Sequence, residues 1–303
     1  MKIVIAGGTG FLGRPLAESL AADGHAVVVL TRHESAGIDG VRTVPWDLKR
    51  TLAPWAVEVD GADAVINLAG EPIADHRWSA AQKHRIEESR IVATERIVKA
   101  IGEAGRPPAL LLNGSAVGFY GNCGDAVVTE ETGAGHDFLA GVCRRWEAQA
   151  VAASSASTRV VCVRTGLVLA RRGGALPRML PPFRMGVGGR LGSGRRYWPW
   201  IHHRDWLGLI RFILNTPSIV GPINATAPAP VTNDEFTREL GRALGRPTYF
   251  PVPRLALVLL LGEMADALLL SGQRAMPTKA QQFGYTFAYP TLPLALDAVL
   301  HHE

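Results

Sequence analysis

The sequence predicts an α/β protein with a doubly wound parallel sheet and a small, mainly α-helical lobe toward its carboxyl end. Three observations lead to this prediction. A β-branched run, Ile3-Val4-Ile5, precedes a glycine-rich turn and then leucines at helical spacing. Apolar runs of strand length alternate with helical stretches as far as residue 165. Beyond Arg164 the composition changes to one rich in glycine, proline and arginine.

The strands and helices of the first part follow from local patterns. Each predicted strand is a short apolar run suited to a buried parallel sheet. These runs are residues 3–6, 27–30, 41–44, 64–68, 110–112 and 160–163. Helices are expected to begin at Ser79 and Thr232, because Gln82 and Glu235 stand at the spacing of a capping box.

The second part is predicted to be less regular. Residues 173–199 show little periodicity, which indicates an irregular insertion on the substrate side. Residues 223–225 are expected to return a strand to the main sheet. The segments 232–244, 254–270 and 291–300 have the pattern of helices.

Composition excludes several protein classes. With 303 residues, 47% of them hydrophobic, the chain can bury a large core. Its longest apolar run, residues 255–262, is short of the roughly 20 residues that a membrane span needs, so it is predicted to be a buried or amphipathic helix and no membrane partner is expected. The amino terminus shows no signal peptide, which favours the cytoplasm. Cys123, Cys143 and Cys162 suit neither disulfides nor a metal site.

Positive charge is concentrated in one stretch. The net charge is +5, and nine arginines between residues 171 and 211 share their stretch with a single acid, Asp205. They are Arg171, Arg172, Arg178, Arg184, Arg190, Arg195, Arg196, Arg204 and Arg211. Two interpretations stay open: a solvated surface, or a patch for an anionic small-molecule substrate or cofactor phosphate. The interleaved aromatic and basic pattern of nucleic-acid modules is missing, so no nucleic acid is expected.

The glycine-rich turn predicts a dinucleotide site. Gly7 permits the tight turn, Gly10 lets the backbone approach a pyrophosphate, and Gly13 lets the helix approach the sheet. The backbone of Thr9, Phe11 and Leu12 completes the turn. Amino-terminal N–H groups of the helix then face the phosphates.

The end of the second predicted strand favours NADP. Enzymes that prefer NAD carry an acid there, whereas this chain has Thr31-Arg32 and no acid before Glu34. A guanidinium at Arg32 can pair with the additional phosphate of NADP. Asp47, followed by Leu48, is expected near the adenine, with capping of the next turn as the alternative role.

Several segments together resemble a known family. They are the glycine run, Asn67-Leu68-Ala69-Gly70, Ser115 within 113–121, and Trp200-Ile201-His202-His203-Arg204-Asp205. The chain resembles an extended short-chain dehydrogenase/reductase of the NAD-dependent epimerase/dehydratase family. Segments such as Glu71-Pro72-Ile73, Arg164-Thr165-Gly166-Leu167 and Leu270-Ser271-Gly272-Gln273-Arg274 are similar to the subgroup of epimerase family proteins with a distinctive carboxyl-terminal domain.

The resemblance implies a division of the chain and a set of cofactor contacts. Residues 1–165 are the NADP-binding Rossmann domain, with a returning strand near 200–226, and residues 166–199 and 227–303 form the substrate-side lobe. Leu68, Ala69, Gly70, Arg90 and Ser115 are expected to contact the cofactor beyond the glycine turn.

The catalytic positions depart from the family. The resemblance implies a Tyr-x-x-x-Lys pair, but those positions fall on Phe138 and Val142, which transfer no proton, and the asparagine position falls on Arg90. Ser115 is the member of the usual set that remains, and it is expected to orient the reacting oxygen. Tyr120 is expected to be the nearest proton donor if a cation such as Arg90 lies beside it, and a wall residue otherwise.

The sequence alone therefore supports two hypotheses about function. One is an NADP-dependent oxidoreductase or epimerase-like enzyme acting on a small, anionic substrate. The other is an NADP(H)-binding redox sensor or scaffold without turnover, which the loss at Phe138 and Val142 favours. A sugar-nucleotide epimerase proper conflicts with the missing base. The oligomeric state stays open, with a homodimer among the alternatives.

Overall fold

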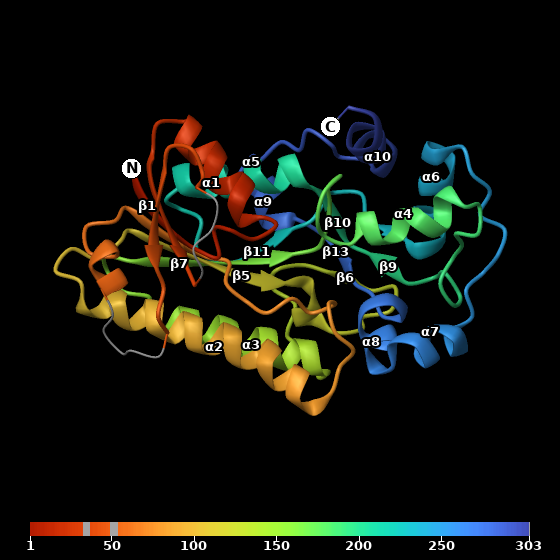
Figure 1. The fold of residues 1–303 in the computed structure, drawn as a ribbon, viewed down its shortest axis with the longest axis horizontal. Coiled ribbons are helices and arrows are strands. Elements are labelled where there is room, and N and C mark those ends of the chain that lie inside the picture. Colours follow the sequence, from red (N-terminus) through yellow and green to blue (C-terminus); the bar gives the residue numbers. More distant parts are fainter. Residues whose placement is uncertain (33–36, 49–53, 303) are drawn as a thin grey trace.

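A seven-stranded parallel sheet forms the centre of the protein, in the order β11-β7-β5-β4-β1-β2-β3 (Figure 1). The computed structural model describes residues 1–32, 37–48 and 54–302. The strands are β1 (Lys2–Ala6), β2 (Ala26–Thr31), β3 (Val41–Pro45), β4 (Ala64–Asn67), β5 (Leu110–Ala116), β7 (Arg159–Thr165) and β11 (Gly221–Ala225). The order reverses between β1 and β4, where a doubly wound sheet binds its ligand at the carboxyl ends of the strands. The predicted fold class is confirmed.

The strand predictions hold, with differences at the ends. All six predicted runs correspond to parallel strands of the sheet, although the run 64–68 extends one residue past the end of β4 at Asn67, and β11 confirms the returning strand. The prediction ended β5 and β7 too early, since β5 runs to Ala116 and β7 to Thr165. Consequently Ser115 and Arg164 lie inside strands, paired with each other in register.

Helices cover both faces of the sheet (Figure 1). One face packs against α1 (Gly13–Ala22), α5 (His203–Asn215) and α9 (Thr278–Gln282). The other packs against the 3-10 helix η1 (Pro54–Glu58), α2 (Ala80–Glu103) and α3 (Phe138–Val151). Successive strand residues serve the two layers in turn, as Ile3 and Ile5 face one core and Val4 the other.

The remaining elements form a lobe beside the carboxyl ends of the strands (Figure 1). Its helices are α4 (Leu176–Arg184), α6 (Asn233–Leu244), α7 (Arg254–Leu261), α8 (Glu263–Ala265), the π-helical turn η3 (Asp266–Leu270) and α10 (Leu292–His301). Short strand pairs connect it: β6 (Val127–Val128) with β13 (Arg274–Ala275), β8 (Leu167–Leu169) with β10 (Trp200–His202), and β9 (Tyr197–Trp198) with β12 (Val231–Thr232). The 3-10 helix η2 (Val117–Tyr120) follows β5.

Three predictions about this lobe were wrong. The segment 173–199, expected to be irregular, contains α4, which begins near Pro177 because proline suits the first turn of a helix. The helix expected over 254–270 is broken at Gly262, whose φ of +64° ends α7. The run 255–262 is also not a buried or amphipathic helix, since Leu255, Leu259 and Leu260 are exposed by 70%, 70% and 73%.

The predicted helix starts are present in the structure. Thr232 and Glu235 form a complete capping box at α6. Ser79 caps α2 by accepting from Gln82 N, but the side-chain oxygen of Gln82 accepts from Arg85 instead of completing a box. Across the described ranges, we find no helix long and apolar enough to span a membrane.

Candidate cofactor and substrate site

The turn between β1 and α1 leaves no room for side chains at three of its glycines, Gly7, Gly8 and Gly13. Gly7 has a φ of +78°, and a Cβ on it would lie 2.8 Å from the carbonyl carbon of Leu68. A Cβ on Gly13 would lie 2.1 Å from the Gly7 oxygen. Gly8, which the sequence prediction passed over, is equally confined, because its Cβ would lie 2.5 Å from Val29 Cγ2.

The outer side of this turn is open to a ligand. Thr9, Gly10 and Phe11 are exposed, while Gly10 N donates to the Gly7 oxygen at 3.0 Å and fixes the turn. Leu12 precedes α1 and supplies no side-chain cap. The first N–H groups of a helix without such a cap are suited to phosphate oxygens.

The ends of β2 and β3 lie side by side at the same edge. Trp46 N donates to the Thr31 oxygen at 2.7 Å, which holds the two strand ends together. Arg32 is exposed just beyond β2, and Asp47 is exposed just beyond β3. Leu48 is half-buried against the sheet, whereas Glu34 lies outside the described residues.

On the other side of the switch point, the segment after β4 contacts Arg90. Leu68 N donates to the Ala6 oxygen at 2.9 Å, and Ala69 N donates to Asn67 Oδ1 at 3.2 Å. A Cβ on Gly70 would lie 2.9 Å from Arg90 Cζ, so the guanidinium rests on this backbone. Burial lowers the pKa of Arg90.

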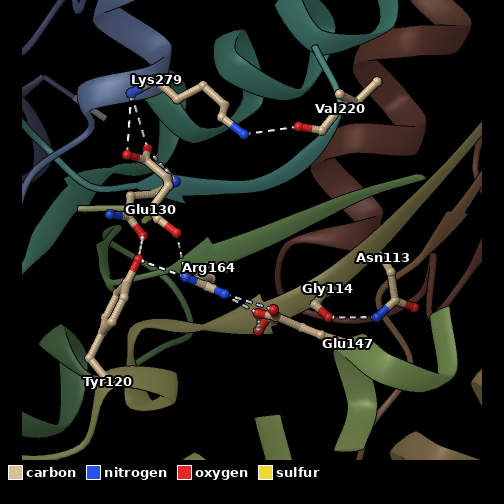
Figure 2. Close-up of polar contacts among 10 residues, drawn as sticks. Asn113, Gly114, Tyr120, Glu130, Glu147, Arg164, Val220 and Lys279 are labelled. Atoms are coloured by element: carbon tan, nitrogen blue, oxygen red, sulfur yellow. Dashed lines mark hydrogen bonds and ion pairs between the residues drawn. The ribbon is translucent and has the colours of Figure 1, made fainter. Parts of the chain in front are cut away.

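Ser115 is buried at the end of β5 and bound to a carboxylate. Its Oγ donates to Glu147 Oε1 at 2.6 Å. Arg164 holds the same carboxylate through both oxygens, Nε to Oε1 at 2.9 Å and Nη2 to Oε2 at 2.8 Å (Figure 2). Burial opposes the charge on Arg164, but the hydrogen bonds and charge of Glu147 raise its pKa above the ordinary value.

Tyr120 is buried, and its hydroxyl is bonded to two neighbouring side chains. Its hydroxyl donates to Asn224 Oδ1 at 2.7 Å and accepts from Arg164 Nη1 at 3.0 Å, and only 3% of the residue is exposed (Figure 2). Burial raises the pKa of this tyrosine. The cation beside this hydroxyl is Arg164.

The same network reaches the carboxyl-terminal region. The Glu130 carboxylate accepts from Asn224 N at 3.0 Å and from Lys279 N at 3.2 Å (Figure 2). The sequence prediction did not find Glu130, Glu147 or Arg164 as members of the site. One usable signal was present, because Arg164 directly follows the apolar run 160–163 and a buried arginine needs partners.

Both positions of the missing catalytic pair are occupied by packing contacts. The Phe138 ring meets Trp78 edge-on at 5.2 Å and Lys83 Nζ at 5.1 Å. Val142 is buried. Its neighbour Cys143 lies beside Ser115, and burial raises the pKa of that thiol to about 11. Neither predicted position carries a group that transfers protons.

Some arginines of the arginine-rich stretch form ion pairs, and some line a cavity. Arg178 pairs with Asp75 and Arg211 with Asp23, so these two serve contacts between elements. Arg171 and Arg172 line a cavity of 440 Å³ together with Phe11 and Leu12 of the glycine turn.

The histidine pair in this region has a structural place. His202 Nδ1 accepts from Arg204 N at 3.2 Å and so caps α5, while its ring stacks on Tyr289 at 3.7 Å. No group of three metal-ligating side chains occurs in the part of the chain that the structure describes.

Comparison with known proteins assigns the family. The model of the NAD dependent epimerase/dehydratase family matches residues 3–224. The chain belongs to this family. A second model, a domain of unknown function (DUF1731), matches residues 252–299. The resemblance inferred from the sequence is thereby confirmed.

Members of the NAD dependent epimerase/dehydratase family from distant organisms match nearly the whole chain. Epimerase family protein MT2273 of Mycobacterium tuberculosis is 42% identical over 294 residues, which is 97% of this chain and 96% of its own. The chloroplastic SDR39U1 homolog of Arabidopsis thaliana is 42% identical and covers 99% of this chain and 87% of its own. The crystal structure of human epimerase family protein SDR39U1 (isoform2) with NADPH has a TM-score of 0.91, 34% identity and full coverage of both chains.

Proposed function

We propose that the protein is an NADP-dependent oxidoreductase that acts on a small anionic molecule. The observation that carries this proposal is the turn at Gly7 and Gly13, where added side chains would collide with backbone while the outer side stays open. A pyrophosphate fits such a cradle. The human relative crystallised with NADPH supports the same cofactor.

Different residues of the chain would contact different parts of the cofactor. The turn from Gly7 to Gly13 would hold the pyrophosphate, Thr31 and Arg32 the additional phosphate, and Asp47 with Leu48 the adenine side. Leu68, Ala69 and Gly70 would line the nicotinamide side. Bound NADPH would supply a hydride. Ser115 would orient the oxygen of the reacting group.

Proton transfer must differ from that of the wider family. Tyr120 is committed to Asn224 and Arg164, and the hydrogen of Ser115 is committed to Glu147. We therefore propose that solvent supplies the proton and that a cationic side chain polarises the substrate. A reaction of this kind needs no tyrosine phenolate at Phe138.

The second candidate is an NADP(H)-binding protein without turnover. The packing of Phe138 on Trp78 and the burial of Val142 favour it, because both positions serve structure. Stopped-flow absorbance distinguishes the two candidates. Oxidation of stoichiometric bound NADPH by members of a carbonyl library supports the enzyme, whereas tight binding without hydride loss supports the sensor.

Titration calorimetry tests the cofactor assignment. NADPH is expected to bind more tightly than NADH by about 1.5 to 3 kcal/mol, the range of a charge-assisted hydrogen bond. Arg32→Ala should remove this preference. Arg42→Ala is the matched control, because Arg42 is exposed on neighbouring β3 and pairs with Glu58. Equal affinity of the natural protein for both cofactors would refute the assignment.

A further inference from the structure

We infer that Arg90 binds a carboxylate of the substrate and that Ser115 accepts a hydrogen bond from a hydroxyl close to that carboxylate. The substrate class is then a small hydroxy acid. This inference rests on the proposed function and adds the substrate chemistry to it.

The first support is the place of Arg90 in the fold. Its guanidinium lies against the Gly70 backbone, just beyond β4, and its Cζ lies 5.2 Å from the Trp146 ring centroid. Ligands of doubly wound sheets bind at this edge. The phosphate-binding features, the glycine turn and Arg32, follow β1 and β2. Arg90 therefore belongs to the other half of the cleft, where the reacting end is expected.

The second support is the contrast between the buried Arg164 and the partly buried Arg90. Arg164 is held by both oxygens of Glu147, by the Tyr120 hydroxyl and by the Glu130 carbonyl. Arg90 donates a hydrogen bond to the Ile86 oxygen at 2.8 Å, and within the described residues it forms no ion pair.

Partial burial without a bound anion is unfavourable for the Arg90 guanidinium. The charged groups that act on it are Glu71 and, when ionised, Cys143, and neither is bonded to the guanidinium within the described ranges. A desolvated guanidinium gains most from an anion that satisfies its remaining N–H groups. Because the group is a planar fork, a carboxylate can occupy two of its donors at once. A ligand carboxylate would therefore complete this site.

The third support is the state of Ser115. Since its hydrogen points to Glu147 at 2.6 Å, its hydroxyl offers only lone pairs to a ligand. The Trp146 ring connects Ser115 with Arg90, because its centroid lies 5.2 Å from Arg90 Cζ and a Cβ on the preceding Gly114 would lie 3.0 Å from Trp146 Cη2. A ligand between them meets a donor at Arg90 and an acceptor at Ser115. A carboxylate with a nearby hydroxyl matches this pair.

Titration calorimetry with three probes tests the inference. Glycolate, acetate and inorganic phosphate are titrated into the protein with and without saturating NADP⁺. We expect glycolate to bind more tightly than acetate, and Arg90→Gln to weaken glycolate about 10- to 100-fold, as expected for loss of a charge-assisted bidentate contact. Arg85→Gln is the control, since Arg85 is exposed on the same helix. It should leave all three affinities unchanged.

Three other outcomes would contradict the inference that Arg90 binds a substrate carboxylate. The inference fails if no carboxylate probe binds, if Arg90→Gln binds glycolate as the natural protein does, or if phosphate affinity falls as much as glycolate affinity. Arg90→Lys, which keeps the charge and loses the fork, carries the test if the glutamine variant does not fold. NADPH affinity separates the two hypotheses. If the natural protein does not bind NADPH, the proposed function is refuted. If it binds NADPH normally and Arg90→Gln binds glycolate as tightly as the natural protein does, only the inference about Arg90 is refuted.

Discussion

At the scale of single residues, one buried guanidinium organises the end of the sheet. Arg164 joins β7 to α3 through Glu147 and to η2 through Tyr120, and its Cζ lies 3.5 Å from the Phe119 ring centroid. If Arg164, Glu147 or Tyr120 were replaced, the side chains bonded to it would be left with unpaired polar groups in a buried place. The network therefore fixes Ser115 indirectly, because Ser115 shares Glu147 with Arg164.

Removing the Tyr120 hydroxyl should affect stability more than chemistry. In Tyr120→Phe, Asn224 and Arg164 each lose a partner in a buried place, so the free energy of unfolding should fall by about 1 to 3 kcal/mol. NADPH affinity should not change, because the phenol hydroxyl bonds to Asn224 and Arg164 and is not needed for phosphate contacts at the glycine turn. Urea denaturation and calorimetry measure the two quantities. Loss of turnover by about 100-fold with unchanged stability would instead restore Tyr120 as proton donor.

His202 should make stability depend on pH. Burial, with the nearby charges of His203 and Arg204, lowers its pKa from 6.5 to about 3 in the folded state. The unfolded chain therefore takes up a proton that the folded protein excludes. The contribution of neutral His202 to the free energy of unfolding is complete above pH 6.5. It is lost as pH falls toward 3, by up to about 1.4 kcal/mol per pH unit.

The variant His202→Asn isolates this effect. Asparagine can still accept from Arg204 N and cap α5, but it does not titrate. Its unfolding free energy should change less between pH 7 and pH 5 than that of the natural protein. Asp205, whose pKa burial raises, contributes with the opposite sign in both proteins and cancels in the comparison. Equal slopes in denaturation experiments would show that His202 is not the group responsible.

At the scale of elements, the geometry of the glycine turn predicts that replacing Gly13 by alanine has the opposite effect on stability from the one that helix propensity predicts. Replacing a helical glycine by alanine ordinarily stabilises by about 0.5 to 1 kcal/mol. Gly13→Ala should instead lower the melting temperature and abolish NADPH binding, because its Cβ would lie 2.1 Å from the Gly7 oxygen. Gly102→Ala in α2 is the control, since nothing lies within 4 Å of its Cβ. Similar gains in both variants would contradict the proposed cradle.

Elements that depend on local patterns were predictable from the sequence. The turn from Gly7 to Gly13, the parallel strands and the capping box at Thr232 each follow from neighbouring residues. The break at Gly262 and the exposure of α7 were not predicted. An apolar run indicates a helix equally well whether its leucines are covered or exposed, because coverage depends on elements distant in the sequence.

The candidate site was predicted less completely for the same reason. Glu130, Glu147, Arg164 and Asn224 come from a loop, a helix and two strands, and only the strand order brings them together. Ser115 and Arg90 were found through the family resemblance. The commitment of the Ser115 hydrogen to Glu147, and of Tyr120 to Asn224, required side-chain positions that no motif specifies.

At the scale of the whole molecule, the sheet and the carboxyl-terminal lobe depend on each other. The Asp205 carboxylate, at the start of α5, accepts from Ala288 N at 2.7 Å and from Tyr289 N at 2.9 Å. Glu130 accepts from Lys279 N at 3.2 Å. The buried face of α10 packs with α6 in a separate apolar core. Residues after 226 therefore satisfy buried carboxylates that belong to the sheet and its helices.

This dependence predicts that a fragment of residues 1–226 does not fold by itself, although it contains every strand of the main sheet. Asp205 would lose both of its backbone donors, Ala288 N and Tyr289 N, whereas Glu130 would lose Lys279 N and keep Asn224 N. A buried carboxylate without its donors is destabilising by several kcal/mol. Thermal denaturation followed by circular dichroism should show no cooperative transition for the fragment, and calorimetry should show no NADPH binding. The full chain, measured in parallel, should show both. A fragment that melts cooperatively and binds NADPH like the full chain would mean that the lobe only covers the substrate, and that the two carboxylates tolerate the loss of their partners.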